Sequence, residues 1–300
     1  MGSETQTITV RVPCSTSNLG SGFDTLGLAL ALYNDVQVSR IPASCVVLDQ
    51  VPEGTDPALL LGMLSEASQA YFECTKQEPF GASVSLASSI PSGRGLGASA
   101  TARLGIVGAL NALAGSPLNR EELLDLVTTL EHHPDNASPC LLGGFTVSGM
   151  VNGRVRCLSF PVSADLKFVT LVPDFQIATN EARKLVPGTY SKEDTVHSLN
   201  RASLISAAFS SGNYQALRGV FDDRVHQPYR EKLIPQLSRV IRAGEGAGAI
   251  GGWLSGSGSA IMCMTLENVE AISTAMQAEL PKSRMLILTA DNRGMEIVER

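Results

Sequence analysis

The residues best suited to chemistry lie in a glycine-rich loop at residues 91–102, with the sequence PSGRGLGASATA. An alternating apolar and polar stretch before it predicts a strand, and leucines at helical spacing after it predict a helix. Gly93, Gly95 and Gly97 allow backbone N–H groups to converge, and the helix N-terminus adds partial positive charge. The loop therefore predicts a phosphate site, at which the Ser99 hydroxyl is suited to a phosphate or to a phosphate-bound Mg²⁺.

Three other interpretations of these glycines exist. A plain turn is the simplest of them. The spacing Gly93-x-Gly95-x-x-Ala98 also fits a dinucleotide-binding fingerprint, but residues 113–120 predict a helix end and a turn where that fingerprint needs a strand with an acidic end. A Walker loop needs a lysine after the glycines, and none follows here.

A polar segment at residues 14–27, CSTSNLGSGFDTLG, follows a predicted first strand. Asn18 and Asp24 are costly to place beside apolar residues unless they bind something. A carboxylate recognises an α-ammonium group, and an amide can bond to either end of a zwitterion. A tight connection between two strands is the structural alternative.

A third segment, EHHPDNASPCLLGGF, begins at Glu131 after a predicted helix. It places Glu131, His133, Asp135 and Asn136 within six positions, between two apolar stretches. Such a density of ionisable and amide groups is typical of a site, although a helix end followed by a proline turn would also explain it.

These segments resemble the motifs of the GHMP kinases, a family that includes galactokinase, homoserine kinase, mevalonate kinase and phosphomevalonate kinase. The run PxGxGLGxSA resembles their ATP-phosphate loop, whereas NLGxGFD and HPDN are closer to the homoserine kinases than to other members. A second glycine-rich segment, WLSGSGSAI, resembles the third family motif, with Ser259 where the family usually has proline. The resemblance covers nearly the whole chain.

The resemblance implies ATP and Mg²⁺ as cofactors. The ATP-binding residues that it implies are Pro91, Gly93, Arg94, Gly95, Leu96, Gly97, Ala98, Ser99 and Ala100. Ser99 and Glu131 would hold the metal. Family members commonly carry an asparagine near adenine at the position of Ala58, so the resemblance does not imply direct recognition of adenine at that position.

The resemblance also implies that the small-molecule substrate is L-homoserine. The substrate-binding residues that it implies are Asn18, Asp24, His133, Asn136, Thr179, Arg183 and Arg230. Asp24 would bind the α-ammonium, Arg230 would clamp the α-carboxylate, and Arg183 would lie nearer the phosphoryl group. If Arg183 and Arg230 did not lie in stretches that resemble the family, each would be interpreted as a solvated surface residue.

The residues that would act at the reacting atoms are Asn136, Arg183 and His133. Mevalonate kinase has a catalytic aspartate where this chain has Asn136, and because an amide is a poor base we interpret Asn136 as a positioning group. Thr179 also suits the N-cap of a helix, which is its structural alternative.

The order of the predicted elements favours an α+β fold over a doubly wound sheet. The resemblance implies a two-domain GHMP-kinase fold, with an N-terminal ATP-binding domain at residues 5–162 and a C-terminal ferredoxin-like α/β sandwich at residues 163–300. No low-complexity linker marks the boundary, so we expect the two domains to pack tightly.

The composition excludes several classes of protein. The 300 residues are 44% hydrophobic and 17% charged, which suits an enzyme with a large core. A net charge of −6 without runs of Lys or Arg argues against nucleic acid and anionic membranes as partners. The six cysteines are far apart and form no C-x-x-C pair, so we expect mostly buried thiols in a reducing cytoplasm.

The activity implied by the resemblance is ATP-dependent phosphorylation of the L-homoserine hydroxyl to O-phospho-L-homoserine, a step of threonine biosynthesis. Two alternatives stay open. One is another small-alcohol kinase of the family, of the L-threonine or mevalonate type, and the other is a catalytically inactive paralogue that senses a ligand. A homodimer is left open as well.

Overall fold

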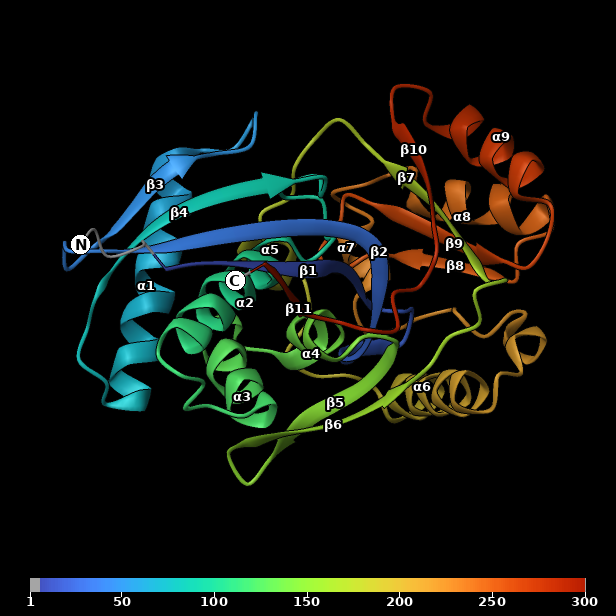
Figure 1. Ribbon diagram of the computed structural model, residues 1–300. Helices are drawn as coiled ribbons and strands as arrows, with labels where there is room; N and C mark the ends of the chain where they lie inside the picture. The colour runs from blue at the N-terminus through green and yellow to red at the C-terminus, as the bar shows by residue number, and fades with distance from the viewer. Residues whose placement is uncertain (1–5, 300) are drawn as a thin grey trace.

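Two sheets organise the chain, whose computed structural model describes residues 6–299 (Figure 1). Within those residues the first sheet runs β11-β1-β2-β4-β3, with β5 attached to β2 and β6 attached to β5. All of its strand pairs are antiparallel except β3–β4. Its strands are β1 (Thr7–Asn18), β2 (Gly22–Ile41), β3 (Val46–Gln50), β4 (Gly81–Ser88), β5 (Phe145–Val151), β6 (Arg154–Phe160) and β11 (Glu296–Glu299).

Four helices pack on one side of this sheet (Figure 1). They are α1 (Pro57–Thr75), α2 (Ala98–Leu113), α3 (Arg120–Glu131) and α4 (Pro134–Leu142). The local sequence explains where two of them begin. The Asp56 side chain caps α1 by accepting from the backbone N–H of Ala58, and Asn119 and Glu122 form a capping box at the start of α3.

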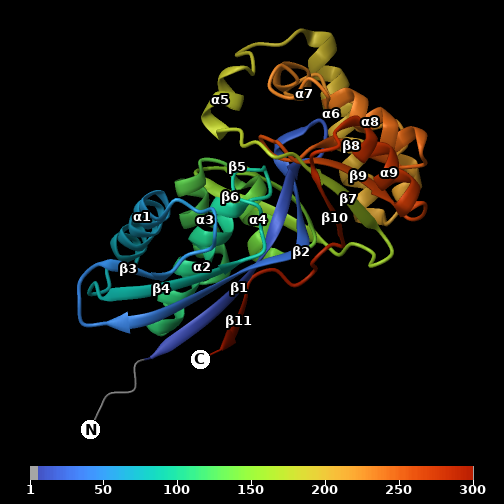
Figure 2. The same ribbon diagram turned by 90° about the horizontal axis from the view of Figure 1, so that it is seen from above.

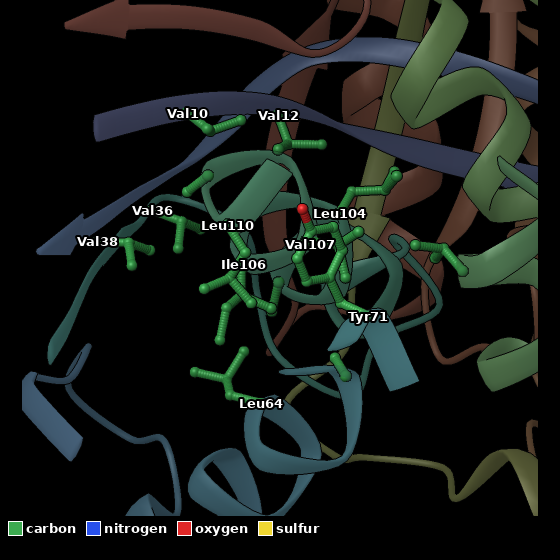
Figure 3. Packing of buried hydrophobic residues seen from close by; sticks show 14 of the residues in the cluster. Val10, Val12, Val36, Val38, Leu64, Tyr71, Leu104, Ile106, Val107 and Leu110 are labelled. Atoms are coloured by element: carbon green, nitrogen blue, oxygen red, sulfur yellow. The ribbon is translucent and has the colours of Figure 1, made fainter. Parts of the chain in front are cut away.

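The first core lies between β1, β2 and these helices, and α2 runs through its centre (Figure 3). Alternate valines of the two strands meet apolar residues of α2 and α1. The residues labelled in Figure 3 are Val10, Val12, Val36, Val38, Leu64, Tyr71, Leu104, Ile106, Val107 and Leu110. Because α2 is buried on nearly every side, its first turn and the glycine loop before it are held in place.

The second sheet is antiparallel, in the order β10-β7-β9-β8. Its strands are β7 (Lys167–Val172), β8 (Gly251–Leu254), β9 (Ile261–Thr265) and β10 (Arg284–Leu288). Helices α8 (Leu237–Gly246) and α9 (Val269–Glu279) cover one face, and α6 (Lys192–Ser211) packs in the core on the other. Shorter helices are α5 (Thr179–Lys184), η1 (Tyr214–Leu217) and α7 (Gln227–Arg230).

Two elements join the halves. The first part of β2 contributes Leu26 and Leu28 to a core that also contains Phe168 and Trp253 of the second sheet. At the other end of the chain, β11 returns to pair with β1 (Figure 2). The structure confirms the predicted α+β class. The boundary near residue 162 stays a prediction. It places β11 in the C-terminal domain, whereas this strand pairs with β1 of the first sheet. The predicted limits at residues 5 and 300 lie outside the described residues.

The cysteines only partly meet the expectation of buried thiols. Cys14, Cys140 and Cys263 are buried, whereas Cys45 and Cys74 are exposed, and all six thiols are free. Burial raises the pKa of Cys140 to about 12, which makes it an unreactive thiol. Among residues 6–299, none of the helices combines the length and the apolar character needed to cross a membrane.

Candidate active site

A cleft of about 1100 Å³ opens beside the glycine loop. It is lined by the end of β1, the start of β2, the loop before α2, the starts of α4 and α5, and the loop after β8. Every site residue predicted from the sequence lines it except Ala100, whose side chain is fully buried in the first turn of α2. The fold therefore gathers the predicted residues from segments far apart in the chain.

The glycine loop has the conformation of an anion cradle. Gly93, Gly95 and Gly97 have φ values of 66°, 75° and 68°, which favour glycine. A Cβ atom on Gly95 would lie 2.1 Å from the carbonyl oxygen of Ser255. Gly97 is the N-cap of α2 and has no side chain with which to cap it, so the first N–H groups of that helix are available to a phosphate.

The loop between β8 and β9 supports this cradle from behind. The Ser255 hydroxyl donates to the carbonyl oxygen of Gly95 at 2.7 Å, and the backbone N–H of Ala260 donates to that of Arg94 at 3.0 Å. Ser259, which replaces the usual proline of the family motif, donates to the carbonyl oxygen of Phe175 at 2.6 Å. The two glycine-rich motifs thus form one packed unit.

The two predicted metal ligands meet at the start of α2. The Ser99 hydroxyl donates to Glu131 Oε2 at 3.0 Å. Arg103 was not predicted, and its guanidinium lies 2.5 Å from Glu131 Oε1 and 2.8 Å from Glu66. A hydroxyl and a carboxylate are the oxygen donors that Mg²⁺ prefers, so this pair fits the metal, and Arg103 offsets the carboxylate charge.

At the start of α4, one buried carboxylate organises a second group of side chains. Asp135 is 2% exposed, and its Oδ1 lies 2.6 Å from His133 Nδ1. Asn136 accepts from the Ser15 hydroxyl at 2.9 Å and donates to Ser17 at 3.1 Å. These bonds fix the Asn136 amide, which supports its interpretation as a positioning group.

The His133–Asp135 pair shifts both pKa values. Burial lowers the pKa of His133, but the hydrogen bond and charge of Asp135 outweigh it, so this pKa is raised. Burial raises the pKa of Asp135, but the hydrogen bond and charge of His133 outweigh it, so this pKa is lowered. Because the pKa of His133 is higher in the folded protein than its unfolded value of about 6.5, the protonated imidazole stabilises the fold at pH values below 6.5. This contribution is lost as the pH rises through the pKa of the folded protein.

We therefore expect His133→Gln to cost more stability at about pH 5.5 than at about pH 8.5. Urea unfolding of the variant and of the unchanged protein at both pH values measures the two differences. His132→Asn, at the neighbouring exposed histidine, is the matched control for the loss of an imidazole. Equal losses at both pH values would show that the pair is not charged in the folded protein.

Asp24 and Arg183 form a bidentate ion pair across the cleft. Arg183 Nη2 lies 2.7 Å from Asp24 Oδ1, and Nη1 lies 3.0 Å from Oδ2. The family resemblance implied that Asp24 binds the α-ammonium and that Arg183 lies nearer the phosphoryl group, and the structure pairs these two side chains with each other. Both ends of the Asn18 amide are also occupied, by the backbone N–H of Asp24 and the carbonyl oxygen of Gly256, so Asn18 shapes the turn that presents Asp24.

Arg230 is the buried cation of the cleft. Its side chain donates to the carbonyl oxygen of Gly256 at 2.9 Å and lies 3.2 Å from His226 Nδ1. Because a guanidinium only donates, Nδ1 must accept, which places the proton of His226 on Nε2, 2.8 Å from the carbonyl oxygen of Gly20. Burial, together with the nearby positive charge of Arg183, lowers the pKa of Arg230 to about 10.

Thr179 lies at the rim of the cleft and is exposed. Its hydroxyl lies 3.4 Å from that of Ser257, and Ala178 is the N-cap of α5, so the alternative interpretation of Thr179 as the cap is wrong.

Sequence reasoning missed several residues of the site. These are Ser15, Ser17, Phe23, Arg103 and His226. Asp135 was noted within its motif but was given no role. Phe23 stands inside a quoted motif and could have been chosen with it, whereas the positions of Arg103 and His226 depend on the fold.

Apolar side chains line the end of the cleft beyond the glycine loop. They are Pro52, Leu59, Leu60, Met63, Leu86 and Ile90. Ala58 is not part of this lining, in line with the sequence analysis. A flat aromatic ring would bury itself here against apolar surface.

Two parts of the chain match known family models. Residues 59–144 match the GHMP kinases N terminal domain, and residues 201–282 match the GHMP kinases C terminal. A homoserine kinase of Caldicellulosiruptor bescii is 36% identical over 299 residues, which cover 97% of this chain and 96% of that protein. A homoserine kinase of Aquifex aeolicus is 34% identical over 295 residues, with coverage of 97% and 99%.

Solved structures share the fold. The homoserine kinase from Cytophaga hutchinsonii matches with a TM-score of 0.88 at 24% identity, covering 99% of each chain. The L. major mevalonate kinase in complex with R-mevalonate matches with a TM-score of 0.71 at 16% identity, covering 97% of each. The chain therefore belongs to the GHMP kinases, has their two-domain fold, and falls among the homoserine kinases of that family.

Proposed function

We propose that this chain is a kinase that transfers the γ-phosphoryl group of ATP to the side-chain hydroxyl of L-homoserine, giving O-phospho-L-homoserine. One observation carries the proposal. A carboxylate, Asp24, and a buried guanidinium, Arg230, line the same cleft as the glycine loop. They offer a partner for each end of an amino acid, beside a cradle for phosphate.

The protein contributes mainly positioning and electrostatics. The glycine loop and the N-terminus of α2 would hold the phosphates, and the apolar end of the cleft would hold the adenine ring. Ser99 and Glu131 would hold Mg²⁺, which would neutralise charge on the phosphates. Asn136, fixed by Ser15 and Ser17, would orient the acceptor hydroxyl.

The acceptor hydroxyl does not require an obligatory base. When bonding to the nucleophile is slight in the transition state, an alcohol need not be deprotonated first. His133 is held by Asp135, whose carboxylate keeps the imidazole oriented. We propose that His133 binds and orients the acceptor, and that the phosphates can receive the proton.

An ADP-release assay with four acceptors tests the proposal. L-homoserine, L-threonine, mevalonate and galactose are supplied in turn with ATP and Mg²⁺. We expect turnover with L-homoserine to exceed that with the others. Faster turnover with L-threonine or mevalonate would show that this alcohol, and not L-homoserine, is the substrate. No turnover with any acceptor would favour the inactive ligand-sensing alternative.

We expect Ser99→Ala to lower kcat by about tenfold or more while binding of L-homoserine changes little. The hydroxyl bonds to Glu131 and has no hydrogen bond to Asp24 or Arg230 in the described chain, so its loss should affect mainly phosphoryl transfer. Steady-state kinetics give kcat, and calorimetry gives the Kd for L-homoserine. Unchanged turnover would remove Ser99 from the mechanism.

The proposed setting is the cytoplasm, where ATP is available and cysteines stay reduced. The six free thiols and the substrate chemistry support this placement.

A further inference from the structure

We propose that the Asp24–Arg183 ion pair selects acceptors that carry a cation, because the substrate ammonium takes the place of Arg183 on Asp24 and thereby frees Arg183 for the phosphates. This inference rests on the proposed function and deepens it. It makes Arg183 a determinant of specificity as well as a group near the reacting atoms.

The pair is built so that a ligand can exchange with it. Both side chains line the cleft, and their exposed fractions are 33% for Asp24 and 34% for Arg183. An ion pair with this exposure gains little net stability, because water competes for both charges. A primary ammonium that enters the cleft can therefore replace the guanidinium without disrupting the core.

Arg183 and Arg230 share a single aromatic ring. Their guanidinium carbons lie 5.4 Å and 5.1 Å from the centroid of the Phe23 ring. Two like charges over one ring repel each other, and Asp24 supplies the bidentate counter-charge to Arg183. Within residues 6–299, Arg230 Nε is buried without a hydrogen-bond partner, so this arginine keeps a donor that an anion could use.

A zwitterion completes both sites at once. Its carboxylate would offset the charge of Arg230, and its ammonium would offset that of Asp24, so the net charge of the cleft is unchanged. Arg183 is then left without its partner. Asp135 and His133 also face this region, but they are already bonded to each other at 2.6 Å and do not offer Arg183 a free carboxylate.

The freed guanidinium would lie in the same cleft as the phosphate cradle. Arg183 belongs to α5, and the segment leading into that helix packs on the glycine loop, where the backbone N–H of Ile177 donates to the carbonyl oxygen of Gly93. A cation released here is attracted by phosphates. An alcohol or hydroxy acid without an ammonium leaves Arg183 on Asp24, so it lacks this contribution.

Calorimetry without ATP tests the exchange by the direction in which the affinity for each ligand changes. L-homoserine and 4-hydroxybutyrate, which lacks the ammonium, are titrated into the unchanged protein and into Arg183→Met. We expect L-homoserine to bind the variant about two- to fivefold more tightly, the range that corresponds to the worth of an exposed ion pair. Binding of 4-hydroxybutyrate should be unchanged or weaker, because the variant frees no partner for it.

Two further variants serve as controls. Lys184→Met removes an exposed positive charge from the same helix and should leave the affinity for L-homoserine unchanged. In an Asp24→Asn background, Arg183→Met should no longer tighten binding, because the carboxylate that it would free is absent. Thermal melts of all variants verify that they are folded.

The outcomes separate this inference from the proposed function. Weaker binding of both ligands by a similar factor in Arg183→Met would show that Arg183 contacts the substrate without leaving Asp24, and would overturn the exchange. Binding of L-homoserine to none of the proteins would overturn the proposed function itself.

Discussion

Gly95→Ala should abolish ATP binding and lower the free energy of unfolding by roughly 2–5 kcal/mol. The added Cβ would lie 2.1 Å from the carbonyl oxygen of Ser255 and 2.9 Å from the backbone nitrogen of Gly258. Because both contacts are backbone atoms of the supporting loop, the change must push the two glycine-rich motifs apart. Urea unfolding and calorimetric titration with ATP measure the two effects.

Gly153→Ala is the matched control, because Gly153 has the same φ of 75° but no atom within 4 Å of its added Cβ. It should lower the free energy of unfolding only by the cost of a Cβ atom at a positive φ, about 1–2 kcal/mol, and leave ATP binding intact. The same loss of stability in both variants, together with unchanged ATP binding by Gly95→Ala, would contradict the account of the cradle.

Arg230→Met should lower kcat/KM for L-homoserine by about a hundredfold or more, with little change in the KM for ATP. Arg230 is 2% exposed, and its Nε has no partner within the described chain, so a carboxylate bound there would form a desolvated, charge-assisted contact. Steady-state kinetics with each substrate varied in turn give both values.

Arg230→Lys separates charge from geometry. It keeps the positive charge but loses the fork, so we expect kcat/KM for L-homoserine to fall between those of Arg230→Met and the unchanged protein. Because Arg230 also donates to Gly256, thermal melts of both variants check the fold. A raised KM for ATP with an unchanged KM for L-homoserine would place Arg230 in the nucleotide site instead.

Strong local signals in the sequence predicted much of the fold. An Asn-Gly pair favours a tight hairpin turn, and Asn152 and Gly153 join β5 to β6 with the positive φ that this turn needs. Helix α6 could not be predicted from the sequence, because its apolar residues do not mark the buried face: Val196 and Leu199 are exposed and Ser198 is buried. Strand β11 was missed too, since its four residues form a strand by pairing with the distant β1.

The candidate site, too, has a part that the sequence predicts and a part that depends on the fold. Contiguous motifs located the glycine loop, Asp24 and the His133 to Asn136 segment, and the cleft brings them together. The sequence could not predict which charges pair in the folded protein. Asp24 and Arg183 are 159 positions apart, and only the packing of α5 beside the β1–β2 turn brings them into contact.

The identity of the phosphorylated product tests the central claim most directly. After reaction of ATP with L-homoserine, the ³¹P NMR spectrum of the mixture shows how many protons lie on the carbon that bears the phosphate. The account predicts a new monoester signal, split into a triplet by the two protons of a terminal CH₂–O–P group, that appears only when enzyme, ATP and L-homoserine are all present. Formation of ADP and inorganic phosphate without that triplet would contradict the account.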